Sequence, residues 1–508
     1  MPHRSIVPKA LALLALMALT TTACSVHRLG EDASTSLEAG EIADGLESGA
    51  AGPDGLPTGT TIIGEDGQVI GGPGADGTTG AAGTDGTTAT TAGNVASTGA
   101  DRKASDRGVT KDAIVLGILA TAEDTFGEFG VTYEGKKHEQ VLKPFVDEIN
   151  ASGGINGRKV VIKLERYSPL RTDEMQAACV AMAEDHKVFA AIAPAGFYGD
   201  AEVCMANKQT PLLTSNNSSA DTNYRREQGW VRQTSMNKDR LIKNWVDWMI
   251  ASSQVSGATK HALVYTDVPE DRQIVNDVMI PYMKSRGLQQ PQVAALSLGT
   301  ADTSTAEAQS AVLKFKSDGV ELIWPVTNFL QWYVFLQQAE AARYYPRYTA
   351  SDFGLIATDA TSFYPESQWA NVRGVTTTRT GEAAIGKLPT DAAFNECLKV
   401  YNAAGEKIAP DSEDPSKPDG IEVVNMSFYC EHLALWADAA RRAGVNPTRQ
   451  SFLGALGSTG LWGHRVTLTE RLSLTPAKYD GADLFAIVQW KAACTCNRQI
   501  EGFRQGAW

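Results

Sequence analysis

The 508-residue chain is predicted to be an α/β protein whose two lobes each hold a parallel β-sheet, behind a long unstructured N-terminal segment. Two observations predict the lobes. Apolar runs of strand length alternate with amphipathic runs of helix length from about residue 107, and the alternation restarts near residue 236. The length agrees with them, because 508 residues are too many for one hydrophobic core.

The first strand–helix–strand unit opens the folded part of the chain. Ile114–Leu119 is an apolar run of strand length, Val141–Ile149 repeats apolar residues at helical spacing, and Val160–Leu164 is a second strand-like run. Gly153 and Gly154 are expected to end the helix, because glycine accepts the left-handed backbone that helix ends favour. Strands separated by a helix predict a parallel sheet, whose ligands bind outside the carboxyl ends of the strands.

Two segments of this unit resemble a known family. Asp112-Ala-Ile-Val-Leu-Gly117 and Asn150-Ala-Ser-Gly-Gly-Ile-Asn-Gly-Arg-Lys159 are similar to the opening of type I solute-binding proteins of ABC importers, nearest to the branched-chain amino acid binding proteins. The resemblance covers residues 109–508 and is strongest up to Asn216. It implies the type I periplasmic-binding-protein fold, with two Rossmann-like lobes joined by three crossovers. It also implies that a small molecule is captured between the lobes and delivered to an ABC permease.

Composition argues against several other classes of function. The net charge of −13 and the lack of a Lys/Arg block argue against a nucleic-acid partner. No run of about 18 apolar residues is present to span a membrane. The sequence contains no H-E-x-x-H, no complete phosphate-binding G-x-x-x-x-G-K-[ST] and no G-x-S-x-G motif. We therefore expect no enzyme and no cofactor, with a hydrolase as the alternative because a catalytic triad is not visible in sequence order.

The N-terminus has the features of an export signal. Basic residues precede the apolar core Ala10–Leu19, and small residues precede Cys24. Residues 1–23 are similar to a lipoprotein signal peptide, which implies that Cys24 becomes the lipidated first residue of the mature chain. An ordinary secretory signal cleaved after Ala23 is the alternative.

Residues 24–106 are predicted to form a flexible tether. The segment is rich in Gly, Thr, Ala and Asp and has too few large apolar residues to offset the entropy of ordering. Glycine recurs every third residue from Gly71 to Gly86, but a collagen helix needs many more triplets and much more proline. A coil of about 80 residues reaches roughly 50 Å. Such a tether would hold the folded part away from a lipid surface.

The rest of the chain is predicted to pass between the lobes three times. We expect the first lobe to hold residues 107–235 and 355–460, and the second lobe to hold residues 236–354 and 461–508. Trp230–Ser235 resembles the first crossover of the family, and Gly457–Arg465 is expected to contain the third.

Candidate ligand-binding residues of the first lobe follow two predicted strands. They are Ala195, Gly196, Phe197 and Tyr198 after one strand, and Thr214, Ser215 and Asn216 after the next. In the resembled family, backbone amides and small hydroxyls at these places hold the carboxylate or amide of the ligand, and Thr214 and Ser215 fit that role. Phe197 and Tyr198 depart from the small polar residues of the family. A polar surface loop is the alternative.

The second lobe offers polar and aromatic candidates in the corresponding loops. They are Tyr265, Asp267, Trp324, Thr327, Asn328, Asp352 and Phe353. In the amino-acid binders, an acidic residue near the position of Asp352 pairs with the ammonium group of the ligand. Its alternative role is the N-cap of a helix before Leu355. Aromatic walls with a few polar groups suit a small, partly apolar ligand, although Trp324 and Phe353 are equally suited to a core.

Six cysteines follow Cys24, and an even number in an exported chain favours disulfides. Cys179 and Cys204 lie on consecutive predicted helices, where the resembled family often has a disulfide. Cys397 and Cys430 lie on helix-like segments and are a second candidate pair. The pairing of Cys494 and Cys496 stays open. We expect no metal site, because this one Cys-x-Cys has no second cluster to complete a zinc site.

The sequence thus predicts a monomeric extracytoplasmic binding protein, anchored to the membrane through a lipid and partnered by an ABC permease. Its ligand would be an amino acid, an amide or an aromatic compound. A sensor of the same fold that captures a ligand without transporting it is the alternative, and the sequence does not identify the ligand.

Overall fold

A computed structural model describes residues 101–506 apart from short internal segments. Those segments are residues 123, 126, 128–135, 194–196, 216–219, 300, 354–356, 358–363, 371, 380–387, 411–418 and 495. The predicted signal segment, Cys24 and most of the predicted tether lie outside the described residues. Within them, no helix is both long and apolar enough to cross a membrane.

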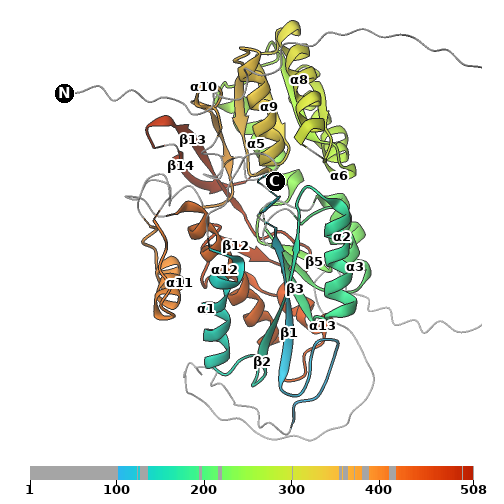
Figure 1. The fold of residues 1–508 in the computed structure, drawn as a ribbon, viewed down its shortest axis with the longest axis vertical. Helices are drawn as coiled ribbons and strands as arrows, with labels where there is room; N and C mark the ends of the chain where they lie inside the picture. Colours follow the sequence, from blue (N-terminus) through green and yellow to red (C-terminus); the bar gives the residue numbers. More distant parts are fainter. Residues whose placement is uncertain are drawn as a thin grey trace, which may run out of the picture. The chain divides into compact units, whose positions relative to one another are not determined.

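The first sheet is parallel and five-stranded, in the order β2-β1-β3-β4-β5. Its strands are β1 (Ala113–Thr121), β2 (Lys159–Tyr167), β3 (Ala190–Ala193), β4 (Leu212–Thr214) and β5 (Val231–Gln233). Helices cover both of its faces, as Figure 1 shows. One face carries α1 (His138–Ala151), α11 (Ala392–Ala403), α12 (Gly420–Arg442) and α13 (Arg449–Gly457). The other carries α2 (Thr172–Val180), the π-helical turn η3 (Ala181–Asp185) and α3 (Asp200–Asn207), and α4 (Asp221–Glu227) follows β4.

The apolar pattern of the sequence accounts for the way α1 packs on this sheet. All the residues predicted to share one face of that helix are buried, among them Val141, Phe145 and Ile149. After the helix, Gly154 has a φ of +67°, and a Cβ there would lie 1.9 Å from the carbonyl oxygen of Arg158. Only glycine fits this turn, and it sends the chain directly into β2.

The second sheet has seven strands in the order β14-β13-β10-β9-β8-β6-β7. Five are parallel: β6 (His261–Thr266), β7 (Gln292–Leu296), β8 (Leu322–Val326), β9 (Arg347–Ala350) and β10 (Arg373–Thr376). β13 (Leu484–Lys491) and β14 (Cys496–Gln505) add an antiparallel pair, joined by the short turn η8 (Ala492–Cys494). One face packs against α5 (Lys238–Ala251), α6 (Pro269–Gln273), η4 (Ile274–Met279) and α7 (Ile280–Ser285). The other packs against α8 (Ala301–Asp318), α9 (Phe329–Ala341) and α10 (Glu366–Trp369).

Two of the expected boundaries between the lobes differ from the structure. The chain does not return to the first lobe at residue 355, because β10 pairs with β9 and β13 in the second sheet. The last crossing does not fall within Gly457–Arg465 either. The hairpin of β11 (Gly460–Trp462) and β12 (Leu472–Leu474) buries Leu472 and Leu474 in the core of the first lobe. The chain leaves that lobe only after Asp480, which bridges to Gln233 of β5.

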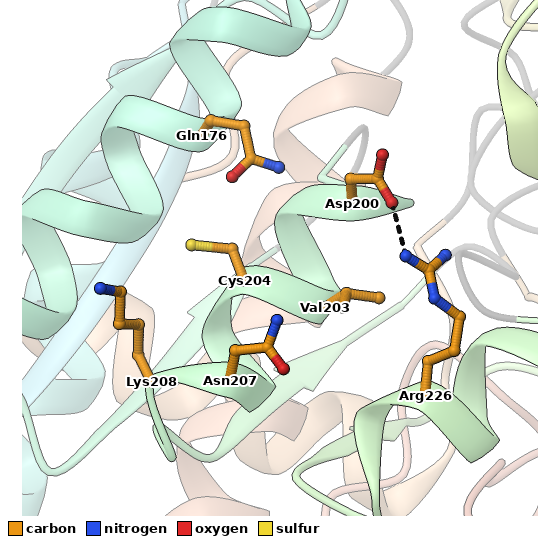
Figure 2. A pocket seen from close by; sticks show the side chains of 7 residues that line it. All are labelled: Gln176, Asp200, Val203, Cys204, Asn207, Lys208 and Arg226. Carbon is orange, nitrogen blue, oxygen red and sulfur yellow. Dashed lines mark hydrogen bonds and ion pairs between the residues drawn. The ribbon is translucent and has the colours of Figure 1, made fainter. Parts of the chain in front are cut away.

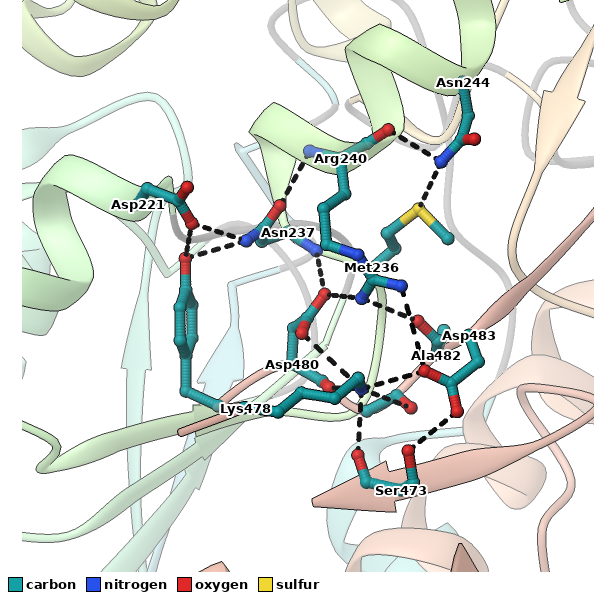
Figure 3. A network of polar contacts seen from close by, with 12 residues as sticks. Asp221, Met236, Asn237, Arg240, Asn244, Ser473, Lys478, Asp480, Ala482 and Asp483 are labelled. Atoms are coloured by element: carbon teal, nitrogen blue, oxygen red, sulfur yellow. Dashed lines mark hydrogen bonds and ion pairs between the residues drawn. The ribbon is translucent and has the colours of Figure 1, made fainter. Parts of the chain in front are cut away.

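The first and last crossovers lie side by side and share the carboxylate of Asp480 (Figure 3). The backbone N–H of Asn237 donates to Asp480 Oδ2 at 3.0 Å, and Arg240 forms an ion pair with the same oxygen. Gly481 passes so close to the first crossover that a Cβ would lie 2.5 Å from the carbonyl oxygen of Thr234. Charge-assisted hydrogen bonds to a buried carboxylate therefore hold the two connections together.

The end of the predicted tether is folded onto the first lobe, contrary to the expected boundary at residue 106. The fully buried Arg158 donates from Nε to the carbonyl oxygen of Thr110 at 2.6 Å and from Nη2 to that of Lys103 at 2.9 Å. Asp106 accepts from the Nε of Arg449 at 3.0 Å. The glycine-rich turn that carries Arg158 thus also fixes the chain from residue 101 onward.

The predicted disulfides Cys179–Cys204 and Cys397–Cys430 are both confirmed. The first joins α2 to α3, and the second joins α11 to α12. Cys496 is also disulfide-bonded. The side chain of Cys494 lies outside the described ones.

A buried carboxylate on α12 makes stability depend on pH. Glu431 Oε2 accepts from the backbone N–H groups of Thr467 and Leu468 at 2.8 and 2.9 Å, and burial raises the pKa of Glu431 to about 7. Because the folded state then holds this proton more tightly than the unfolded state, the stabilisation is full below the ordinary pKa of 4.5 and is lost as the pH rises through 7.

Glu431→Gln cannot ionise at this position. We predict that its free energy of unfolding, measured relative to that of the unmodified protein, rises by about 3 kcal/mol as the pH increases from 4.5 to 8. Urea unfolding across that range measures the difference. Glu148→Gln, in which a partly exposed carboxylate loses its ion pair with Arg465, is the matched control. Stability curves of Glu431→Gln and the unmodified protein that run parallel would show the prediction to be wrong.

Candidate functional site

The parallel strands of both sheets end in loops that carry the predicted ligand residues. Because carboxyl ends of parallel strands meet at one edge of a sheet, these loops gather at one edge in each lobe. Ala195, Gly196 and Asn216 lie outside the described residues. Most of the other predicted residues pack, cap a helix or pair with neighbours, and Tyr198 and Phe353 stand near a buried charged group.

The two aromatic residues after β3 have different surroundings. Phe197 is 1% exposed and packs edge-on against Tyr167, with ring centroids 5.2 Å apart. Tyr198 donates its hydroxyl to the carbonyl oxygen of Pro169 at 2.9 Å, and its ring centroid lies 6.0 Å from Lys238 Nζ. Phe197 therefore belongs to the core of the first lobe, whereas Tyr198 reaches the first helix of the second lobe.

The end of β4 is tied to the first crossover. The carbonyl oxygen of Thr214 accepts from the backbone N–H of Thr234 at 2.9 Å and lies 3.3 Å from His432 Nε2. Burial lowers the pKa of His432 to about 4, so its imidazole is neutral at physiological pH. Thr214 and Ser215 are both almost fully buried. These contacts hold the end of β4 against the first crossover, where the chain leaves for the second lobe.

The residues after β6 and β8 form a polar network at the start of α9. Asn328 caps that helix by accepting from the backbone N–H groups of Leu330 and Gln331 at 3.1 and 3.0 Å. Thr327 and Thr266 place their hydroxyls 3.2 and 2.8 Å from Gln331 Oε1. The sequence placed Thr327 and Asn328 at the ligand, and here their side chains order the loop.

Tyr265 and Trp324 are buried within the second lobe. Trp324 is fully buried and meets Trp245 of α5 edge-on, with centroids 5.0 Å apart. Its packing fits the alternative role in the core. Asp267 is only partly buried and pairs with Arg272 of α6, with Nη2 and Oδ1 2.5 Å apart.

Asp352 joins the ends of β9 and β10. Its carboxylate accepts from the hydroxyl of Thr376 and from both the backbone N–H and the hydroxyl of Thr377, each at 2.6 Å. Burial raises the pKa of Asp352 in spite of these hydrogen bonds. The alternative role as a helix cap before Leu355 concerns a residue outside the described ones.

A buried ion cluster that the sequence analysis did not single out lies beside these loops. Lys238, the first residue of α5, places Nζ 2.7 Å from Glu270 Oε1 and 2.9 Å from Asp271 Oδ1. The ring centroids of Tyr198 and Phe353 lie 6.0 and 5.8 Å from the same nitrogen. We call Lys238, Glu270 and Asp271 the Lys238 cluster.

Burial lowers the pKa of Lys238, but the two carboxylates raise it further than burial lowers it, so the ammonium stays charged. Charged residues are seldom buried unless paired, and the Lys238 cluster meets that condition with one cation and two anions. The sequence offered only one indication of this cluster, namely that Lys238 follows the first crossover and Glu270 follows β6. The 32-residue separation hides the pairing itself.

A hollow of about 540 Å³ lies elsewhere, among α2, α3 and α4 (Figure 2). Gln176, Asp200, Val203, Cys204, Asn207, Lys208 and Arg226 line it. Its charged side chains are already paired, Arg226 with Asp200 at 2.9 Å and Lys208 with Glu184. We place the candidate site at the strand ends instead, where the open-sheet rule puts ligands. Among the described residues, no group of three potential metal ligands occurs.

Comparison with known families decides what this fold is. Residues 116–493 match the sequence model of the family described as "Periplasmic binding protein". The chain belongs to this family. It is a type I periplasmic binding protein of the kind that serves ABC transporters, as the resemblance implied. Such proteins bind small molecules outside the cytoplasm, work with ABC permeases and are typically not enzymes.

Solved structures share the fold of this periplasmic binding protein at low identity. A fatty acid ABC transporter substrate-binding protein from Thermomonospora curvata is 14% identical, covers 79% of this chain and 95% of its own, and has a TM-score of 0.58. The leucine binding protein LivK from Thermotoga maritima is 13% identical, with coverages of 77% and 99% and a TM-score of 0.57. A solute binding protein from Rhodopseudomonas palustris, in complex with 3,4-dihydroxybenzoic acid, is 11% identical, with coverages of 78% and 98% and a TM-score of 0.56.

At these identities, the structural likeness shows a common fold. No protein with a curated description matches the chain.

We predict that Asp352→Ala lowers the free energy of unfolding by about 3 kcal/mol, because buried donors of Thr376 and Thr377 lose a charged acceptor. Asp352→Asn should lose less, since one acceptor oxygen remains. Chemical denaturation measures both. Asp267→Ala, which removes a partly exposed ion pair, is the control and should cost far less. Equal losses at the two positions would contradict the role assigned to Asp352.

Proposed function

We propose that this periplasmic binding protein is an extracytoplasmic lipoprotein that captures a small molecule between its two lobes and delivers it to an ABC permease. The ligand is an amino acid, an amide or an aromatic compound. The observation that carries the proposal is the family match, which runs from within β1 to the end of β13 and so includes every strand of both sheets except β14.

The placement of polar and aromatic groups supports ligand capture at the strand ends. Tyr198 of the first lobe and Phe353 of the second both face Lys238, so residues from the two lobes approach one charged group. A ligand that contacts both lobes favours their closed arrangement through its differential contacts, and a permease can then recognise closure. We include Ala195, Gly196, Thr214, Ser215 and Asn216 in the proposed site, because the same loops carry them.

We propose that Cys24 carries the lipid and that the segment after it is the tether. The attachment of residues 103 and 106 to Arg158 and Arg449 supports this arrangement, because any pull on the tether would then be borne by the first lobe. The second lobe would remain free to move about the crossovers. Mass spectrometry of the protein from its native host should find a mature chain that begins at diacylated Cys24. An unmodified Cys24 would contradict lipidation.

A ligand sensor of the same fold is the alternative, because capture and closure could signal to a membrane partner without transport. A cell-envelope hydrolase is a weaker alternative, since the family is one of solute-binding proteins.

We predict that at least one compound among amino acids, amino-acid amides and aromatic acids raises the melting temperature of the purified protein. Binding to the folded state alone adds about 2.7 kcal/mol at a ligand concentration of about 100 times Kd. Uptake of the same compound by cells should fall when the gene is deleted. Binding with unchanged uptake would favour the sensor, and hydrolysis of an ester or amide panel would favour the hydrolase.

A further inference from the structure

Four cationic side chains form a row across one end of the second sheet, one from each of the neighbouring strands β9, β10, β13 and β14. Arg373 of β10 lies opposite Gln489 of β13, which lies opposite Arg498 of β14, and residues directly opposite share a face of the sheet. Lys491 of β13 donates from Nζ to Gln489 Oε1 at 2.8 Å. With Arg347 of β9, we call Arg373, Lys491 and Arg498 the basic row.

The basic row lies on the face of the sheet that packs against α5. Thr349 of β9 lies opposite Arg373 and accepts from Trp245 Nε1 of α5 at 2.9 Å. Arg347 stands two residues before Thr349 and so shares its face, and its Nη1 donates to the carbonyl oxygen of Gln254 at 2.8 Å. β9 and β10 begin at Arg347 and Arg373, so the basic row lies at the edge of the sheet opposite the candidate ligand site.

The positive charge of the basic row is exposed and largely uncompensated. Three of its side chains are exposed and have no carboxylate partner in the part of the chain that the structure describes, namely Arg347, Arg373 and Arg498. Glu321 lies beside the start of β9 but forms no ion pair with Arg347. Glu501 of β14 is already paired with Arg504 at 2.7 Å. In a chain of net charge −13, this concentration of positive charge is a local exception.

The composition of the basic row suits a surface of phosphate groups. Guanidinium groups bind phosphate through two parallel hydrogen bonds, and arginine supplies three of the four cations. Neighbouring strands lie about 4.8 Å apart, so a row across four strands spans roughly 14 Å. β14 also leaves Ile500 38% exposed, two residues after Arg498. Basic residues beside an exposed apolar side chain are the combination that segments lying on a lipid surface use.

We infer that the basic row binds the phosphate groups of an anionic phospholipid surface, with Ile500 entering the headgroup layer. The inference goes beyond solute capture and rests on the proposed lipid anchor only for the nearness of the membrane. A tether that ends on the first lobe holds the row at a high effective concentration near that surface. The row then gives the second lobe an attachment of its own, at the edge away from the ligand loops.

Sedimentation with lipid vesicles tests the inference without a solute and without the lipid anchor. The protein is the mature chain from residue 24 carrying Cys24→Ser, and the vesicles contain phosphatidylcholine alone or phosphatidylcholine mixed with phosphatidylglycerol. At low salt, binding to the anionic vesicles should be at least about tenfold tighter than binding to the neutral ones. The preference should disappear near 1 M salt, where charges are screened within about 3 Å.

The combined change Arg347→Gln, Arg373→Gln and Arg498→Gln should weaken binding to the anionic vesicles about a hundredfold, because each basic residue near such a surface is worth about fivefold. Replacing the same three arginines by lysine keeps the charge and should keep most of the binding. The matched control removes the same charge from exposed lysines of the first lobe and should bind as the unmodified chain does. It combines Lys111→Gln, Lys159→Gln and Lys163→Gln.

Ile500→Ser separates a lipid surface from a soluble polyanion. It should weaken binding to the anionic vesicles and leave any binding of soluble polyphosphate unchanged. Binding of polyphosphate without binding of vesicles would overturn the inference in favour of an anionic polymer.

Two further outcomes would overturn the inference. One is binding to neutral and anionic vesicles that is equal or absent, and the other is an equal loss of binding in the glutamine variant of the basic row and in the lysine control. Neither outcome bears on solute capture, because no solute is present. Failure of the proposed function would show separately, in the thermal-shift screen.

Discussion

The carboxylate of Asp480 is the contact on which the relation between the two lobes depends. It is 2% exposed and accepts from the backbone of Asn237 while pairing with Arg240, so it connects the last crossover to the first. Nearby, the hydroxyl of Tyr479 donates to Asp221 at 2.5 Å, and the Tyr479 ring stacks on Tyr224 of α4. The first and last crossovers are thereby held together as one connection between the lobes. Any movement of one lobe against the other would have to involve this polar junction.

The same connection explains why charged groups gather where they do. The first crossover ends at α5, so Lys238 stands directly beyond Asn237, where the chain enters the second lobe. β6 delivers Glu270 and Asp271 to the same place through α6, and β9 delivers Phe353. Parallel order in both sheets is thus what brings residues distant in sequence to one site. The first crossover then places Lys238 beside Glu270 and Asp271, which follow the end of β6.

Local patterns made much of this fold predictable. The apolar face of α1 and the glycine turn before Arg158 are local features, and both are present as the sequence indicates. The boundaries between the lobes were harder to predict from the sequence. β10 is only four residues long, and it belongs to the second sheet because it pairs with β9 and β13. The β11–β12 hairpin likewise belongs to the first lobe only because its leucines reach the core beneath α12.

The candidate site was predicted from strand ends alone, without the partners of its side chains. Apolar runs placed Tyr198 and Phe353 just after two strands, and the structure puts both rings about 6 Å from Lys238 Nζ. Asp352 was the expected partner of a ligand ammonium, yet its oxygens accept hydrogen bonds from Thr376, the last residue of β10, and from Thr377, more than twenty residues later. Glu270 lacked any local mark, since its partner Lys238 lies 32 residues earlier in the sequence. Side-chain partners set by tertiary contact are not encoded in spacing.

Hydrogen–deuterium exchange of the full chain, with and without a compound proven to stabilise it, tests the location of the site most directly. Protection should concentrate in the peptides around residues 197–200, 214–224, 265–271 and 351–353, with slower exchange at the crossovers 233–237 and 479–483. Protection confined to α2, α3 and α4 around the hollow lined by Gln176, Asn207 and Arg226, with no change in the second lobe, would contradict the account.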